Sequence, residues 1–254
     1  MIEITAADGH IIPNKTVLQG SDSLVVMSHG ITTDKEEDGL YTEFAESLLA
    51  PSFDSIRFDF RGHGESRVPS EQTTVAGELL DLMAVVKWAR ESGHRKIFHL
   101  ATSFGASVTL LALSRFSFND LSAVVFWNPV IDYHNTFIEP KVEWAREFFD
   151  QKEETELAYR AGTKVSETDF VIGPLMTMEL LLLHPEQTIW PSSPPLLIIH
   201  GDADTCVPFS DAEEYMIRNH DSVTLHRVPG VDHGFDDKIQ DVCQQTVQWF
   251  EEQD

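Results

Sequence analysis

A serine between a predicted strand and a predicted helix constrains the fold of this chain more than any other feature. Residues 101–105 read Ala-Thr-Ser-Phe-Gly and follow the run Ile-Phe-His-Leu at 97–100. A sharp strand-to-helix turn presents a serine hydroxyl at the edge of a sheet, and small residues two positions to either side let the backbone close without a clash. The pattern predicts Ser103 as a nucleophile, provided that a base, an acid and oxyanion donors occur in the right places.

Apolar runs alternate with helical patterns along most of the chain. The expected strands cover residues 23–28, 55–60, 96–102, 121–127, 195–200 and 223–228, and the expected helices cover 41–50, 71–92, 104–114, 211–219 and 238–252. Two short β-like runs at 1–5 and 16–18 are expected to form an antiparallel edge. Strands rich in Val, Ile, Leu and Phe that alternate with helices indicate an α/β fold, with a mostly parallel central sheet and helices on both faces.

The segment 132–191 departs from this alternation. It contains helix-like stretches at 142–153 and 175–183, with no good strand between them. About sixty residues exceed the length of an ordinary crossover connection. We therefore expect residues 1–254 to form a single domain with a small helical cap inserted at about 132–191, over the carboxyl edge of the sheet where ligands bind in open α/β folds.

The amino-acid composition limits the cellular setting and the classes of binding partner that we expect for this protein. The 254 residues are 42% hydrophobic and carry a formal net charge of −24, which repels nucleic acid phosphates and anionic membrane surfaces. There is no basic-plus-apolar N-terminal signal and no apolar stretch of about 20 residues, so we expect no membrane insertion. Two cysteines do not indicate a disulfide framework and favour a reducing, cytoplasmic setting. The oligomeric state and a salt-adapted origin of the acidic surface stay open.

Two backbone amides are expected to form an oxyanion hole. The strand at 23–28 is followed by His29, Gly30 and Ile31, and such a turn brings the Ile31 N–H towards the active site. The residue after the nucleophile, Phe104, supplies a second N–H at the start of a helix. Two such donors stabilise the negative oxygen of a tetrahedral intermediate. His29 precedes the nucleophile in the chain and is expected to orient the turn.

Two carboxylates compete for the role of the catalytic acid. The strand at 195–200 is followed by His-Gly-Asp-Ala-Asp-Thr-Cys-Val-Pro at 200–208. The acid must accept from an imidazole while it remains ionised, and Asp204 fits that position in the turn better than Asp202. Asp202 is expected to accept from backbone N–H groups of the turn. Cys206 is interpreted as a small buried filler.

The candidate base lies on a glycine-flanked loop before the last helix. Residues 229–235 read Pro-Gly-Val-Asp-His-Gly-Phe, which places His233 in that loop. The other late histidines, His220 and His226, lie near a helix end and within a strand. Ser103, Asp204 and His233 therefore follow one another in the order nucleophile, acid, base.

With these motifs the chain resembles the α/β-hydrolase superfamily over essentially its full length. Residues 57–66 read Arg-Phe-Asp-Phe-Arg-Gly-His-Gly-Glu-Ser, similar to the Asp-x-Arg-Gly-x-Gly-x-Ser turn of many members. Ala101 stands where the family usually has Gly in the nucleophile motif. The resemblance implies two-step acyl transfer by Ser103, His233 and Asp204, with the oxyanion bound by the Ile31 and Phe104 N–H groups and with no metal or organic cofactor.

The resemblance is strongest to small bacterial carboxylesterases, including cinnamoyl or feruloyl esterases, and to acyl thioesterases. The cap is rich in apolar residues, so we expect an ester substrate with an apolar or aromatic acyl group. An acyl thioesterase ranks second, because the acidic surface repels coenzyme A or an acidic carrier protein. A ligand-binding homologue with little turnover is a third reading. The residues expected to line the pocket are Thr32, Phe148, Met178 and Val207.

Overall fold

The central sheet of the protein, seen in a computed structural model, has seven strands. The structure describes residues 2–116, 121–149, 162–165 and 168–253. In spatial order the strands are β1 (Asn14–Val17), β3 (Asp54–Phe58), β2 (Ser23–Ser28), β4 (Lys96–Thr102), β5 (Leu121–Trp127), β8 (Leu196–Gly201) and β9 (Val223–Val228). β1 pairs antiparallel with β3, and the remaining neighbours pair in parallel. The mostly parallel sheet of an α/β hydrolase is therefore confirmed.

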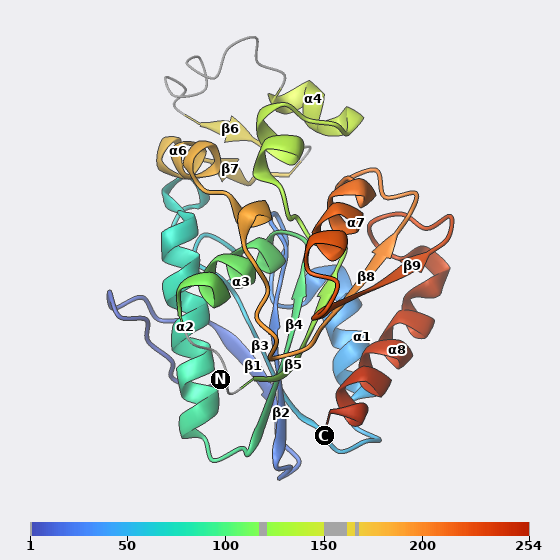
Figure 1. The fold of residues 1–254 in the computed structure, drawn as a ribbon. Coiled ribbons are helices and arrows are strands. Elements are labelled where there is room, and N and C mark those ends of the chain that lie inside the picture. The colour runs from blue at the N-terminus through green and yellow to red at the C-terminus, as the bar shows by residue number, and fades with distance from the viewer. Residues whose placement is uncertain (1, 117–120, 150–161, 166–167, 254) are drawn as a thin grey trace.

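Helices cover both faces of this sheet. Figure 1 shows α2 (Val75–Glu91) and α3 (Phe104–Arg115) on one side and α1 (Leu40–Ser47) and α8 (Ile239–Glu252) on the other. Successive residues of β2 enter different cores, since Leu24 and Val26 pack with α2 and α3 whereas Val25 and Met27 pack with α1 and α8. A strand buried on both faces reads as a continuous apolar run. No helix of the described residues is long and apolar enough to cross a bilayer.

The segment between β5 and β8 forms a cap at one end of the sheet (Figure 1). It contains a π-helical turn (His134–Ile138), α4 (Glu143–Phe149), α6 (Pro174–Leu182) and a 3-10 turn (Pro185–Gln187). The expectation of no strand in this segment is wrong, because β6 (Thr163–Lys164) and β7 (Val171–Ile172) form a small antiparallel pair. Two residues are too few to produce an alternating pattern in a sequence. Residues 150–161, into which the expected helix 142–153 extends, lie outside the described part.

Other expected boundaries also need correction. The helix expected at 71–92 begins at Val75, because Thr74 has extended backbone and its hydroxyl accepts the Gly77 N–H, which is an N-cap. Residues Ser70–Gln72 form a separate 3-10 turn. The edge strand runs over Asn14–Val17, while the expected run at 1–5 contributes only a single bridge from Thr5 to Ile11. α7 (Phe209–Arg218) begins two residues earlier than expected. That the whole chain is one domain stays our proposal.

A carboxylate of the cap closes the N-terminus of a body helix. Glu179 of α6 accepts the Val75 N–H at 2.5 Å through Oε2 and the Ala76 N–H at 3.3 Å through Oε1. The first N–H groups of a helix lack partners within the helix and attract a negative charge. Two further contacts join cap and body: the Val171 N–H donates to Ser70 Oγ at 3.1 Å, and the Phe170 ring stacks on His63.

We expect Glu179→Ala to destabilise the protein by about 1 kcal/mol, because two helix N–H groups lose their acceptor. Chemical denaturation measures this change. Glu179→Gln is the matched control, since its amide oxygen can still accept from the helix, and it should lose less. An alanine variant as stable as the wild type would show that this contact does not hold the cap to the body.

Candidate active site

Ser103 occupies a strained turn between β4 and α3. Its backbone has φ 50° and ψ −118°, a conformation that costs a non-glycine residue of order 1–3 kcal/mol. Two contacts across the neighbouring strand hold it there: the Ser103 N–H donates to the Trp127 carbonyl at 2.9 Å, and the Ser103 carbonyl accepts the Val130 N–H at 2.9 Å. The side chain is thereby fixed at the carboxyl edge of the sheet, with 6% of the residue exposed.

Two glycines allow the turn after β2 to touch the serine turn. A Cβ on Gly105 would lie 2.5 Å from the His29 carbonyl oxygen and 2.7 Å from that of Ser28. A Cβ on Gly30 would lie 2.9 Å from Ser103 Cβ. Any larger residue at either position would push the two turns apart, so this close approach requires glycine.

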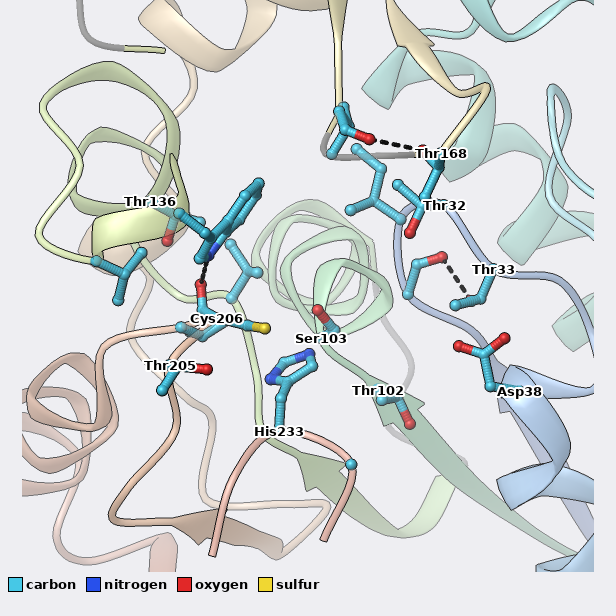
Figure 2. A pocket seen from close by; sticks show the side chains of 18 of the residues that line it. Thr32, Thr33, Asp38, Thr102, Ser103, Thr136, Thr168, Thr205, Cys206 and His233 are labelled. Atoms are coloured by element: carbon cyan, nitrogen blue, oxygen red, sulfur yellow. Dashed lines mark hydrogen bonds between the residues drawn. The ribbon is translucent and has the colours of Figure 1, made fainter. Parts of the chain in front are cut away.

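Asp204 and His233 meet in a hydrogen bond beside Ser103. The His233 Nδ1–H donates to Asp204 Oδ2 at 2.8 Å, which leaves Nε2 to act as an acceptor. Figure 2 shows the His233 ring next to Ser103, and among the described residues no hydrogen bond joins the Ser103 hydroxyl to this ring. The two loops come from different strands, because Asp204 follows β8 and His233 follows β9. Parallel strands deliver these loops to the same edge of the sheet.

Hydrogen bonds keep Asp204 ionised in a buried position. Burial opposes its ionisation, but His233 and His200 hold the pKa of the carboxyl below its usual range. Its Oδ1 also accepts the N–H groups of Cys206 and Val207, at 2.7 and 2.8 Å. His200, whose Nε2 donates to Asp204 Oδ2 at 3.1 Å, is a partner that sequence reasoning missed. The sequence feature that could have identified His200 is the His-Gly pair at 200–201, which ends the strand β8 and lies near Asp204 in the chain.

The ring of His233 is biased towards its charged form. Burial disfavours the cation, but the Asp204 carboxylate outweighs this and raises the pKa of His233 above 6.5. Asp202 plays no part in this pair among the described contacts. Its carboxylate accepts from the Gly230 N–H and from Arg227 Nε, both at 2.6 Å, and so ties the turn to β9.

The loop after β2 is held in a strained shape. His29 Nδ1–H donates to the Gly30 carbonyl at 2.7 Å, and His29 Nε2 accepts the Phe60 N–H at 3.0 Å. Burial lowers the pKa of His29 to about 4, so the ring stays neutral and keeps this tautomer. Thr32 has φ 72°, a rare value for a β-branched residue. Sequence reasoning expected His29 to orient this turn, and these bonds fit that role.

The predicted oxyanion donors come from this loop and from the start of α3. Phe104 is the first residue of α3, where an N–H has no partner within the helix. Among the hydrogen bonds of the described residues, neither the Ile31 N–H nor the Phe104 N–H is used as a donor. Both amides are therefore available to a ligand atom.

A cavity of about 1030 Å³ contains Ser103 and His233. Figure 2 shows Thr32 on one side and Cys206 on the other, with Ser103 between them. Apolar groups from the cap and the body form much of the wall, and these are Ile31, Val130, Phe137, Val142, Trp144, Val165 and Val207. Acidic side chains also line it, namely Glu37, Asp38, Glu143 and Glu147. Such a cavity can hold a medium-sized organic molecule.

The four residues expected to line the pocket have different outcomes. Thr32 and Val207 line the cavity. Met178 does not: it lies on α6 with 38% of its surface exposed, because α6 turns Met176 and Leu180 inward instead. The side chain of Phe148 lies outside the described residues. Sequence reasoning missed Glu37 and Phe137, which carry no motif that would have singled them out.

Cys206 also differs from expectation. It is half-buried in the cavity wall and not a fully buried filler, and its carbonyl accepts Trp144 Nε1–H at 3.0 Å. Burial raises the pKa of its thiol to about 11, so the sulfur stays protonated. Asp204, Cys206 and His233 offer ligand atoms within 4.8 Å of one another. Because the Asp204 oxygens already accept four hydrogen bonds, we do not assign a metal to this group.

Solved structures with the same fold include esterases. Est1E from Butyrivibrio proteoclasticus, solved with ferulic acid bound, has a TM-score of 0.83 and 19% identity, over 100% of this chain and 99% of Est1E. The Pyrococcus furiosus esterase Pf2001 has a TM-score of 0.72 and 23% identity, over 99% and 89%. A putative hydrolase from Agrobacterium vitis S4 has a TM-score of 0.78 and 19% identity, over 97% and 96%.

A family-level match comes from the sequence itself. The pattern of the serine aminopeptidase family S33 matches residues 19–165, which span the turn after β2, the Ser103 turn and the first part of the cap. The match covers more than half of the 254 residues. Together with the sheet order, it shows that this chain belongs to the S33 family of α/β hydrolases.

Proposed function

We propose that this protein is a serine hydrolase that cleaves carboxylic esters with an apolar or aromatic acyl group. The observation that carries the proposal is the 2.8 Å bond between Asp204 and His233 in the cavity that also contains the strained Ser103 turn. A nucleophile, a base and a group that orients the base are the parts that acyl transfer needs.

In the proposed reaction, His233 Nε2 takes the proton of Ser103 as its oxygen attacks the ester carbonyl. Asp204 keeps Nδ1 protonated and stabilises the imidazolium that forms. The Ile31 and Phe104 N–H groups bind the oxyanion of the tetrahedral intermediate. His233 then protonates the leaving alcohol. In the second half, His233 activates a water molecule that releases the acid from Ser103.

Support for the substrate class comes from the cavity. Its apolar wall favours an acyl or aromatic group over a sugar. The esterase Est1E has the same fold and binds ferulic acid, an aromatic acid. The acidic side chains of the wall oppose the phosphates of coenzyme A. The proposed substrate is thus a small neutral ester.

The two free cysteines are compatible with the cytoplasmic setting that we propose.

A substrate panel tests this proposal. It contains p-nitrophenyl esters of increasing chain length, methyl cinnamate and methyl ferulate, acyl-CoA thioesters, and an aminoacyl p-nitroanilide suggested by the family name. We expect the neutral esters to give the highest kcat/KM. Faster turnover of acyl-CoA would make the protein a thioesterase, and faster turnover of the anilide an aminopeptidase. Binding without turnover would make it a ligand-binding homologue.

Ser103→Ala should abolish hydrolysis of the best ester, with a loss on the order of 10³-fold or more, because the nucleophile is gone. Steady-state kinetics and circular dichroism measure activity and folding together. Ser114→Ala on the same helix is the control, since its exposed hydroxyl only bonds the Leu111 carbonyl. Near-wild-type turnover by Ser103→Ala would rule out the proposed nucleophile.

Asp204→Asn should lower kcat about 10²-fold or more, because an amide neither fixes the His233 tautomer nor stabilises its cation. Asp202→Asn is the matched control and should cost far less, since Asp202 bonds only to β9 and its turn. Equal losses would argue against Asp204 as the acid.

The pH profile of the wild type belongs to the same experiment. His233 must be neutral to act as a base and its pKa is raised, so kcat/KM should fall as the pH drops through a midpoint higher than the pKa of an ordinary histidine. A rate that stays flat down to pH 4.5 would contradict the role of His233.

Trp144→Ala should shift selectivity towards bulkier acyl groups, because Trp144 contributes to the cavity wall. A change in fit of this kind is worth about 1–3 kcal/mol of discrimination. The measurement is the ratio of kcat/KM for p-nitrophenyl cinnamate and acetate. Met178→Ala is the control and should leave the ratio unchanged, because Met178 is exposed on α6. An unchanged ratio in Trp144→Ala would show that Trp144 does not shape the pocket.

A further inference from the structure

Glu37 is a buried carboxylate in the cavity. The proposed catalytic triad of Ser103, His233 and Asp204 does not use it. Only 6% of the residue is exposed, and it lines the cavity with Ser103 and His233. Its Oε2 accepts the Gly30 N–H at 2.7 Å, and the Thr33 hydroxyl lies 3.0 Å from the same oxygen. A carboxylate is expensive to bury, so its place beside the reacting serine asks for an explanation.

The second oxygen of Glu37 lies on the serine side. A Cβ built on Gly30 would lie 3.2 Å from Glu37 Oε1 and 3.5 Å from Ser103 Oγ, so both atoms flank the same face of this glycine. No hydrogen bond of the described residues involves Oε1. Glu37 therefore uses one oxygen to hold the turn after β2, while the other lies on the side of Gly30 that also faces the serine hydroxyl.

The backbone is strained where it presents this side chain. Glu37 has φ 47° and Asp38 has φ 51°, both in the left-handed region, and Gly39 follows with φ 96°. Each left-handed non-glycine residue costs about 1–2 kcal/mol. The strained pair directs Glu37 into the cavity while Asp38 stays exposed at its rim. Strain of this kind persists where the surrounding structure enforces it, often at functional sites.

We propose that Glu37 is a positioning residue of this active site. Its Oε2 fixes the Gly30–Ile31 turn, which carries one of the proposed oxyanion amides. Its Oε1 belongs to a second carboxylate in the cavity that His233 also lines. This inference rests on the proposed triad and extends it to a fourth side chain.

The charged groups around Glu37 determine its own protonation and its effect on the protonation of His233. Burial raises the pKa of Glu37 to about 7, against the pull of the Gly30 N–H, the Thr33 hydroxyl and His233. Its other neighbours that bear charge or titrate are Asp38 on the same turn and Tyr41 of α1, while Lys35 is paired with Asp59 and Glu65. When Glu37 is ionised, it favours the imidazolium of His233 and so raises the pKa of that ring.

Glu37→Gln separates the two roles. The amide oxygen can still accept the Gly30 N–H, so kcat at high pH should stay within about 3-fold of the wild type. The negative charge is gone, so the acidic limb of kcat/KM should move down by about 0.5 pH unit or more. Glu37→Ala removes the acceptor as well and should lower kcat by about 10-fold or more. Glu46→Gln is the control for an exposed carboxylate outside the cavity, on α1, and should leave the limb in place.

An NMR titration of the His233 ring measures the same shift without any substrate. The ring signal, assigned with a His233→Gln variant, should titrate at lower pH in Glu37→Gln than in the wild type. The Glu37 carboxyl signal of the wild-type protein should titrate near neutral pH. This measurement does not depend on whether a variant folds. These readouts stand even if the ester panel fails, so failure of the proposed function and failure of this inference are distinguishable.

The inference is overturned by any of three results. In the first, the His233 midpoint of Glu37→Gln equals that of the wild type. In the second, Glu46→Gln moves this midpoint as far as Glu37→Gln does. In the third, the Glu37 carboxyl titrates below pH 5 like an exposed glutamate. A purely structural Glu37 predicts the first result together with a lower melting temperature.

Discussion

The contact between the turn after β2 and the start of α3 is the constraint on which the site depends. Gly105 packs so closely on the carbonyls of Ser28 and His29 that no side chain fits. Because β2 and β4 are parallel neighbours with Ser28 beside Ala101, their two turns start from the same level of the sheet. The contact then holds the loop that carries Ile31 against the turn that carries Ser103 and Phe104. The proposed oxyanion site needs donors that are fixed in advance, and the register of β2 and β4 aligns the two turns that carry them.

The parts of the fold that could be predicted from the sequence are those encoded locally. Ser103, Asp204 and His233 each lie in a turn or loop that follows a predicted strand, and a parallel sheet gathers such positions at one edge. The cap was harder to predict because its elements show no periodic pattern of apolar residues. The strands β6 and β7 have two residues each, and Met178 lies on a helix that is apolar nearly all round. Which face of that helix turns inward is decided by packing. Glu37 was missed because its burial depends on left-handed backbone that no local pattern announces.

Several residues with a strained backbone line the cavity. Four of the eight non-glycine residues that have positive φ in the described part of the chain are in its wall, and these are Thr32, Glu37, Asp38 and Ser103. The strands below them are buried on both faces by two large apolar cores. A close-packed core of this kind resists rearrangement. It can therefore hold several residues in conformations that would relax in a mobile loop.

Two carboxylates near one imidazole behave differently because their surroundings differ. Asp204 receives four hydrogen bonds, which favour its charged form despite burial. Glu37 has one oxygen with polar partners and another with none among the described residues, so burial dominates and its pKa rises to about 7. Environments that push the pKa values of like groups apart allow one to stay ionised while the other exchanges a proton.

With Asp38, Glu143 and Glu147 also on the wall, a carboxylate product of the proposed reaction is repelled by the cavity in which it forms. In the proposed reaction, the acidic wall that opposes anionic substrates thus also favours release of the acid.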